Sequence, residues 1–403
     1  MKTKELIIGF VKKYKIESVA VLIFSVLSAI AFEINELKVK APLFDAIIVF
    51  AFIVAGTFFV DKVFSVYENE IRQKLVNKEH SFKMARWISY LVVIAIEYLL
   101  CTWGAFLINK SSLLNEKTNY FSSANYESIY FMITFATIVL AMIAMLIIYL
   151  VVKEKRISIK EYLLKLFMNS LMVFISCMVV LAGIFVLFLI YDMLLGEIPY
   201  YIISRIIVFL LSVISAMGIL VSIENVDGNQ SIFSKILVRY IMQIMVFIGF
   251  VIFYIYLIKI IIKLEMPSNQ VFSVCTYLFS VGLLTSLMSL GINEVSKYNT
   301  AIKFLPIAFI PALVLQIISI ALRIAQHGLT SARYIGVMVI IFEIVYLVFY
   351  ILDEILKKEK VKLEKVLLIA SLLIFIVCFV PKINMYELPL AYNWWLTKNV
   401  WIW

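Results

Sequence analysis

Two carboxyl groups lie in the middle of apolar runs, where an ionisable side chain is costly. Glu97 occurs within SYLVVIAIEYLLCTWG, and Glu343 occurs within GVMVIIFEIVYLVFY. An ionised carboxylate facing hydrocarbon costs about 3 kcal/mol, so we expect both groups to face protein or water. Each could bind a proton or a cation, could pair with Arg323 or Arg333, or could form a structural hydrogen bond between helices in its protonated form. The sequence leaves these alternatives open.

A second candidate site is the polar segment RIAQHGLTSARY, residues 323–334, between two late apolar runs. It predicts a tight helical hairpin. Gly328 suits the left-handed position that closes a helix, and the hydroxyl of Thr330 or Ser331 suits the cap of the next helix. The candidate ligand-binding or headgroup-binding residues are Arg323, Gln326, His327, Thr330, Arg333 and Tyr334.

The two arginines are the main reason to consider this hairpin a binding site. Arg323 and His327 share one helix face, because residues four apart align. Arg333 falls in the first turn of the following helix, where the helix dipole disfavours a cation. It therefore needs a headgroup phosphate, an anionic ligand or a carboxylate partner. The alternative is interfacial anchoring, in which the arginines extend toward the headgroups and bind no ligand.

Motifs of common enzymes are absent from the sequence. It contains no GxxxxGK[ST] phosphate loop, no GxSxG nucleophile elbow and no HExxH zinc motif. The two histidines and four cysteines are scattered, without metal-ligand spacing. We therefore predict no catalytic residue, no metal site and no cofactor.

The composition indicates which solvent surrounds the chain. Of its 403 residues, 64% are hydrophobic and 15% are charged. A soluble globular protein is about 45–50% apolar and about 25% charged. A water-soluble core cannot hide this much apolar surface, which argues against a disordered protein, a nucleic-acid-binding protein and an ordinary cytosolic enzyme. We expect lipid to surround most of the chain, and no nucleic-acid partner.

Apolar runs long enough to cross a bilayer, about 20 residues, recur along the sequence. They predict an all-α, polytopic helical bundle of about eleven transmembrane helices. The runs fall near residues 16–34, 43–64, 86–108, 129–152, 167–191, 200–222, 237–262, 271–292, 302–324, 333–352 and 364–380.

The distribution of lysine and arginine predicts the orientation of these spans. The net charge is +10, and the segments richest in basic residues are the first, third, fifth and eleventh in chain order. Positively charged segments stay on the cytoplasmic side, so we expect the N-terminus inside and the C-terminus outside. The expected partners are the bilayer, anionic headgroups at its cytoplasmic face and, for a complex, further protein subunits. The Ile/Lys/Asn-rich composition favours a bacterial cytoplasmic membrane.

The expected organisation has four parts. Residues 1–15 form a basic interfacial segment, with Leu6, Ile7 and Phe10 toward lipid. Residues 16–222 hold the first spans, with a cytoplasmic helical stretch at 65–85 and an external loop at 109–128. Residues 236–385 hold the last spans. Residues 386–403 form a Trp-rich tail along the outer surface.

The part from about Ile236 to Met385 resembles the bacterial membrane family called domain of unknown function 4153. That family carries Arg-Ile-x-Gln-Tyr-Gly-Leu/Ile-Thr-x-x-Arg-Tyr between two late spans. This chain matches the motif at Arg323, Ile324, Gln326, Gly328, Leu329, Thr330, Arg333 and Tyr334. It departs at His327, where the family usually has Tyr, and at Ser331, where Glu or Pro is common. The resemblance implies a helical membrane fold and no particular activity, and the His327 departure argues against a strict catalytic role there.

Three functions fit these features. The first is a transport or permease-like protein, or a subunit of a membrane complex. Its support is the number of spans, the mid-membrane carboxyl groups and the kinks expected at Pro306 and Pro311. The second is a non-catalytic scaffold, sensor or assembly factor. The third is an intramembrane enzyme acting on a lipid-linked substrate at the Arg323–Arg333 hairpin.

Overall fold

The computed structural model describes ten parts of the chain, and these are mostly helical, without a strand. They are residues 10–32, 37–68, 70–71, 78–116, 124–195, 199–224, 238, 242–292, 303–357 and 362–400. A helix occupies every one of the eleven apolar runs predicted from the sequence. Each apolar run is about as long as a helix that crosses a bilayer. A helix also satisfies its backbone N–H and C=O groups internally, which an apolar environment requires.

The first half of the chain forms six of these helices. They are α2 (Lys15–Ala31), α3 (Leu37–Val66), α5 (Lys78–Glu116), α6 (Ala124–Lys155), α7 (Ile159–Leu195) and α8 (Tyr200–Glu224). The second half forms α10 (Gln243–Lys263), α11 (Val271–Leu290), η2 (Ile307–Phe309), α13 (Ile310–His327), α14 (Ser331–Tyr350), η3 (Ile351–Ile355), α15 (Lys365–Phe379) and α16 (Glu387–Val400).

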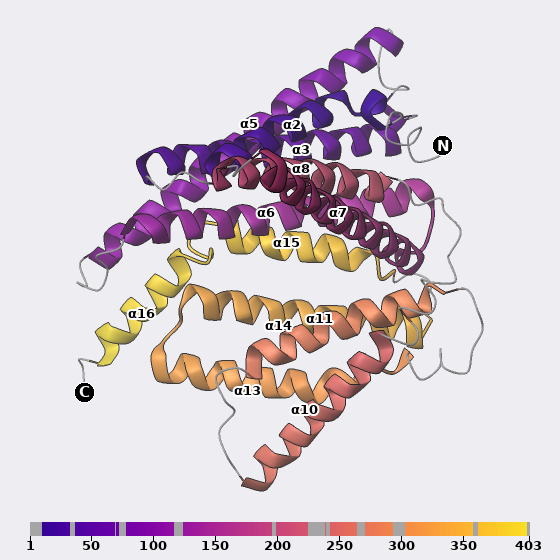
Figure 1. The fold of residues 1–403 in the computed structure, drawn as a ribbon. Helices are drawn as coiled ribbons and strands as arrows, with labels where there is room; N and C mark the ends of the chain where they lie inside the picture. The colour runs from indigo at the N-terminus through magenta and orange to yellow at the C-terminus, as the bar shows by residue number, and fades with distance from the viewer. Residues whose placement is uncertain are drawn as a thin grey trace. The chain divides into compact units, whose positions relative to one another are not determined.

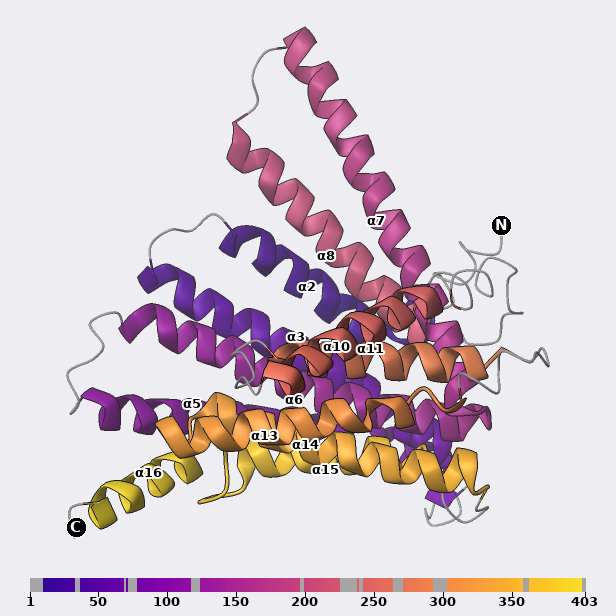
Figure 2. The same ribbon diagram turned by 90° about the horizontal axis from the view of Figure 1, so that it is seen from below.

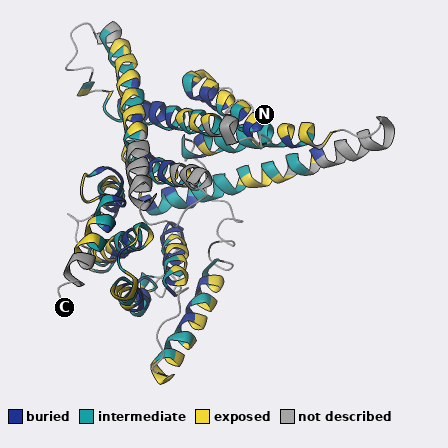
Figure 3. Cartoon of the chain, turned by 90° about the vertical axis from the view of Figure 1, so that its left-hand side faces the viewer, coloured by how far each residue is buried: buried dark blue, intermediate teal, exposed yellow. Residues whose placement is uncertain are grey.

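Eight helical stretches of the described residues are long and apolar enough to cross a membrane. They lie in α3, α6, α7, α8, α10, α11, η2–α13 and α14–η3. The other predicted spans are α5, α2 and α15, the last two with 17 and 15 residues. Large apolar side chains such as Leu91, Phe247 and Ile262 are exposed along the helices (Figure 3). Such surfaces suit lipid, so the chain has the architecture of a multi-pass membrane protein.

The helices divide into two compact units. Unit 1 comprises Met1–Lys155 and Leu166–Asp227, and unit 2 comprises Arg156–Lys165 and Gly228–Trp403. Within unit 1, α3 packs against α2, α5 and α6, and α8 packs against α2 (Figures 1 and 2). Helix α3 therefore has neighbours on several sides, and polar groups along it meet side chains from different helices.

Unit 2 is built mainly from helices that pack on their neighbours in the sequence: α10 on α11, α11 on α13, α13 on α14, and α14 on α15. Its core combines aliphatic side chains with a group of aromatic rings. The ring of Phe279 contacts the rings of Phe309 and Tyr346, and Tyr346 contacts Tyr350.

Two local expectations about unit 1 need correction. Most of the loop expected at 109–128 is helical, since α5 continues to Glu116 and α6 begins at Ala124. The segment contains no Gly or Pro to end a helix. Phe10 does not face lipid: it is buried against the rings of Tyr14 and Phe58. Leu6 and Ile7 lie outside the described residues.

Two further differences concern unit 2. Pro306 and Pro311 do not kink a span, because Pro306 precedes the turn η2 and Pro311 lies in the first turn of α13. Proline is well tolerated there, where its missing N–H has no intrahelical partner to lose. Part of the Trp-rich tail forms helix α16, with Trp394 and Trp395 exposed. Trp401 and Trp403 lie outside the described residues.

Candidate functional site

The hairpin between α13 and α14 closes as its sequence predicts. Gly328 ends α13 with a φ of 73°, a conformation that favours glycine. Thr330 caps α14, and its hydroxyl oxygen accepts a hydrogen bond from the Arg333 N–H at 3.3 Å. Both predictions are confirmed because each depends only on residues close in the sequence.

The Arg333 side chain has a partner that the sequence analysis did not consider. Its guanidinium donates to the carbonyl oxygens of His327 at 3.0 Å and Gly328 at 2.6 Å. These carbonyls close α13, where unsatisfied C=O groups and the helix dipole favour a cation. Arg333 therefore lies in the first turn of one helix to satisfy the end of the preceding helix.

The hairpin is also attached to α16. The Asn393 side chain donates from Nδ2 to the Leu329 carbonyl at 2.8 Å, and its Oδ1 accepts from the Leu329 N–H at 3.0 Å. A Cβ atom on Gly328 would lie 2.6 Å from Asn393 Oδ1, so glycine is also required for this close approach. The sequence does not predict this contact, because no local pattern around Asn393 indicates that its side chain binds the Leu329 backbone.

The other residues of the predicted hairpin site point in different directions. Gln326 and His327 are exposed, Arg323 is half-buried one turn earlier, and Tyr334 is buried. The Tyr334 hydroxyl has no hydrogen-bond partner among the described residues. The hairpin thus brings Arg333 and Thr330 together around backbone groups and does not gather all six residues around one pocket.

Glu343 is fully buried in unit 2 and meets an amide. With its NH₂ group turned toward the carboxyl, Gln316 donates to Glu343 Oε2 at 2.8 Å and accepts from the Thr276 hydroxyl at 3.0 Å. Glu343 lies ten residues beyond Arg333 on α14, about 15 Å along the axis, so the two do not pair. Of the alternatives for Glu343, this geometry favours the interhelical hydrogen bond.

Glu97 has a different environment, in unit 1. Its carboxyl group fills the space beside Gly56 of α3, where a Cβ atom on Gly56 would overlap it. Only 6% of Glu97 is exposed, and neither carboxyl oxygen has a hydrogen-bond partner among the described residues. Such a group is expensive to ionise without a partner.

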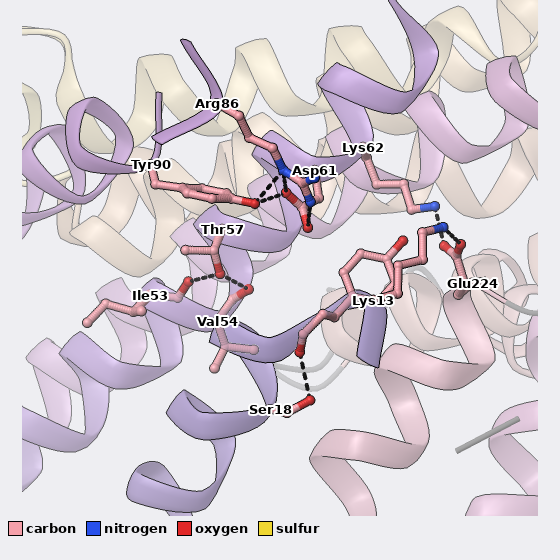
Figure 4. Close-up of polar contacts among 11 residues, drawn as sticks. Lys13, Ser18, Ile53, Val54, Thr57, Asp61, Lys62, Arg86, Tyr90 and Glu224 are labelled. Carbon is pink, nitrogen blue, oxygen red and sulfur yellow. Dashed lines mark hydrogen bonds and ion pairs between the residues drawn. The ribbon is translucent and has the colours of Figure 1, made fainter. Parts of the chain in front are cut away.

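A set of ionic side chains at one end of unit 1, which we call the charged cluster, was missed by sequence reasoning (Figure 4). Its first part joins α3 to α5. Arg86 binds Asp61 through two nitrogens, Nε to Oδ1 at 2.9 Å and Nη2 to Oδ2 at 2.6 Å. The Tyr90 hydroxyl also donates to Asp61 and accepts from Arg86 Nε at 2.7 Å.

The second part of the charged cluster surrounds Lys62. Its side chain is fully buried and forms ion pairs with Glu154 of α6, at 3.1 Å, and with Glu224 of α8. Lys13 also binds Glu224, at 2.6 Å. Burial and then the Glu224 carboxylate raise the pKa of the Tyr14 hydroxyl above its usual range, so Tyr14 stays neutral beside that carboxylate.

A cavity of about 340 Å³ opens beside the charged cluster. Its wall contains cations, carboxylates and aromatic rings. They are contributed by Lys13, Tyr14, Asp61, Phe64, Ser65, Glu68, Phe82, Lys83 and Arg86. A volume of this size lies in the range of small-molecule sites.

Glu17 links the charged cluster to the interior of unit 1. It is 1% exposed, it lies against Thr57, and Asp61 and Arg86 are close enough to act on it electrostatically. Its Oε1 has no hydrogen-bond partner among the described residues.

Comparison of the chain with family models, curated proteins and solved structures gives no match. The resemblance of the Ile236–Met385 part to a bacterial membrane family therefore stays a prediction. Within the described part of the chain, no group of three His, Cys, Asp or Glu side chains is arranged to hold a metal ion. The site with the richest chemistry is thus the charged cluster with its cavity.

Proposed function

We propose that the chain is a permease-like transport protein in which unit 1 binds the solute. The observation that carries the proposal is the cavity beside the charged cluster, at the ends of helices that cross the apolar phase. Its wall presents cations at Lys13, Lys83 and Arg86, and carboxylates at Asp61 and Glu68. Paired charges beside aromatic rings suit a small zwitterion, and we assign free amino acids as the solute class.

The contacts within unit 1 support helices that cross the membrane in alternating directions. The charged cluster joins the start of α2, the end of α3, the start of α5, and the ends of α6 and α8. Alternating spans with the N-terminus inside put all five of these helix ends on the cytoplasmic side. The cavity then opens toward the cytoplasm.

Unit 2 supports the same scheme and a crossing by the short helix α15. Lys160 pairs with Glu354, and Lys303 donates to the Glu354 carbonyl at 3.3 Å; all three residues fall on the predicted inner side. Leu329 and Asn393 bind each other on the predicted outer side. Since α14 and α15 lie between Leu329 and Asn393, two crossings return the chain to the same face. We propose about eleven spans with an external C-terminus, in a bacterial cytoplasmic membrane.

The hairpin gives less support to the enzyme alternative. Arg333 is engaged by the carbonyls of His327 and Gly328, and the candidate residues do not face one pocket. An intramembrane enzyme would need those groups directed at a substrate.

The test is uptake of a radiolabelled amino-acid mixture by proteoliposomes that contain the purified full-length protein. Wild type should accumulate label above empty liposomes, and the transported amino acid should raise its unfolding temperature. Asp61→Asn should lower uptake about tenfold, because it removes a charge-assisted hydrogen bond from the cavity wall. Glu70→Gln, at an exposed carboxyl away from the cavity wall, is the matched control. Uptake by wild type no greater than by empty liposomes would overturn the proposal.

A further inference from the structure

Glu97 and Glu17 are buried carboxyl groups that the solute site does not use. Glu97 of α5 contacts α3 at Gly56, and Glu17 of α2 contacts α3 at Thr57. Helix α3 thus separates two carboxyl groups that approach it from different helices. Neither group has a cation bonded to it in the described residues, unlike Asp61, Glu154 and Glu224 of the charged cluster.

The depth of Glu97 suits a group that changes its protonation during transport. It lies seven residues beyond Tyr90 on α5, about 10 Å further from the charged cluster. The titratable groups of the helices that pack on α5 lie elsewhere along those helices. Among the side chains that the structure describes, they are Asp45, Asp61 and Lys62 on α3, and Tyr149, Lys153, Glu154 and Lys155 on α6.

Asp61 and Glu97 lie at different depths along α3. Asp61 lines the cavity, and Thr57 lies one turn further along α3. The Glu17 carboxyl lies against Thr57, and the Glu97 carboxyl lies against Gly56, the preceding residue. Arg86 forms an ion pair with Asp61, whereas Glu97 has no charged partner among the described residues.

We propose that Glu97 is a proton-binding site that couples the solute cavity of unit 1 to a pH gradient. The inference rests on the proposed transport function and names its co-substrate, the proton. In the resting state Glu97 is a neutral carboxylic acid. It releases one proton to water when the helices part, leaving a carboxylate, and takes one back when they close.

The first experiment measures protonation alone, without transport. Infrared difference spectra of the purified protein between pH 5 and pH 9 detect the carbonyl stretch of a buried carboxylic acid. Wild type should show this band at neutral pH, Glu97→Gln should lose a large part of it, and Glu70→Gln should keep it. An unchanged band in Glu97→Gln would overturn the proposal, whatever the result for transport. Unfolding temperatures of the three proteins check that each is folded, and Glu97→Asp, which keeps a carboxyl, should retain the band.

The second experiment separates coupling from solute transport. Proteoliposomes are given an amino-acid gradient alone, or a pH gradient with equal amino acid on both sides. Glu97→Gln should retain at least half of the uptake driven by the amino-acid gradient and lose the uptake driven by the pH gradient. Equal pH-driven uptake by Glu97→Gln and wild type would overturn the coupling role while leaving the proposed function standing. Failure of wild type with the amino-acid gradient would overturn the proposed function instead.

Discussion

The carboxyl group of Glu97 occupies the space that a side chain on Gly56 would need. Helix α5 approaches α3 closely at this point because glycine has no Cβ atom. A buried carboxyl group without a bonded partner is thereby held between two helices, away from the ion pairs of the charged cluster. This relationship makes the position of Glu97 sensitive to a change on a different helix.

Gly56→Ala should displace the Glu97 carboxyl and destabilise the protein by about 1–3 kcal/mol, the usual cost of overpacking. Thermal unfolding of the purified protein measures the effect. Gly183→Ala is the matched control, because nothing lies within 4 Å of a Cβ atom placed there in α7. That control should be neutral or slightly stabilising, since alanine favours helix more than glycine does. Equal unfolding temperatures for Gly56→Ala and Gly183→Ala would show that Glu97 does not lie against Gly56.

Lys62→Met should destabilise unit 1 by about 3–5 kcal/mol, because it leaves the carboxylates of Glu154 and Glu224 without their buried partner. Adding Glu224→Gln should restore part of the loss by removing one of the two charges. Lys13→Met is the comparison: the Lys13 side chain is 53% exposed, so its loss should cost at most about 1 kcal/mol. Equal losses for the two lysines would contradict the buried arrangement of Lys62.

Asn393→Ala should destabilise unit 2 by about 1–2 kcal/mol, since it removes both hydrogen bonds to the Leu329 backbone. Gln326→Ala, at an exposed position of the same hairpin, should change stability by less than about 0.5 kcal/mol. Chemical unfolding in detergent, followed by tryptophan fluorescence, measures both. If Gln326→Ala proved the more destabilising, α16 would not be attached to the hairpin through Asn393.

Arg333→Gln should lower stability by about 1.5–3 kcal/mol, because the guanidinium donates to the carbonyls of His327 and Gly328. Amino-acid uptake per folded molecule should stay within about twofold of wild type. The result that contradicts this account is abolished uptake with an unchanged unfolding temperature, which would make Arg333 a ligand-binding residue.

Local sequence patterns predict part of this structure well. Each apolar run forms a helix because its own backbone satisfies its hydrogen bonds, and the hairpin at Gly328 and Thr330 forms because glycine and threonine act on adjacent residues. The partners of Arg333 are the carbonyl oxygens of His327 and Gly328, within six residues of it. Predicting them requires recognising that the free carbonyl groups at the end of α13 attract a cation.

Contacts between distant helices are not predictable in this way. Asp61 lies near the end of the predicted span 43–64, where water could solvate it, yet it is buried and bound by Arg86 and Tyr90. Lys62 and Glu224 are separated by four predicted spans. Their one available signal was opposite charge at helix ends expected on the same side of the membrane, which limits the possible partners but does not select one.

The most direct test of the central claim, that a solute site opens at the cytoplasmic end of unit 1, is labelling of Ser65→Cys, a cavity residue, in a chain whose four native cysteines are replaced by alanine. A membrane-impermeant maleimide should label this cysteine in inside-out vesicles and leave it unlabelled in intact cells. The amino acid that wild type transports should slow the labelling at least tenfold. Labelling in intact cells, or a rate in inside-out vesicles that no transported amino acid changes, would contradict the account.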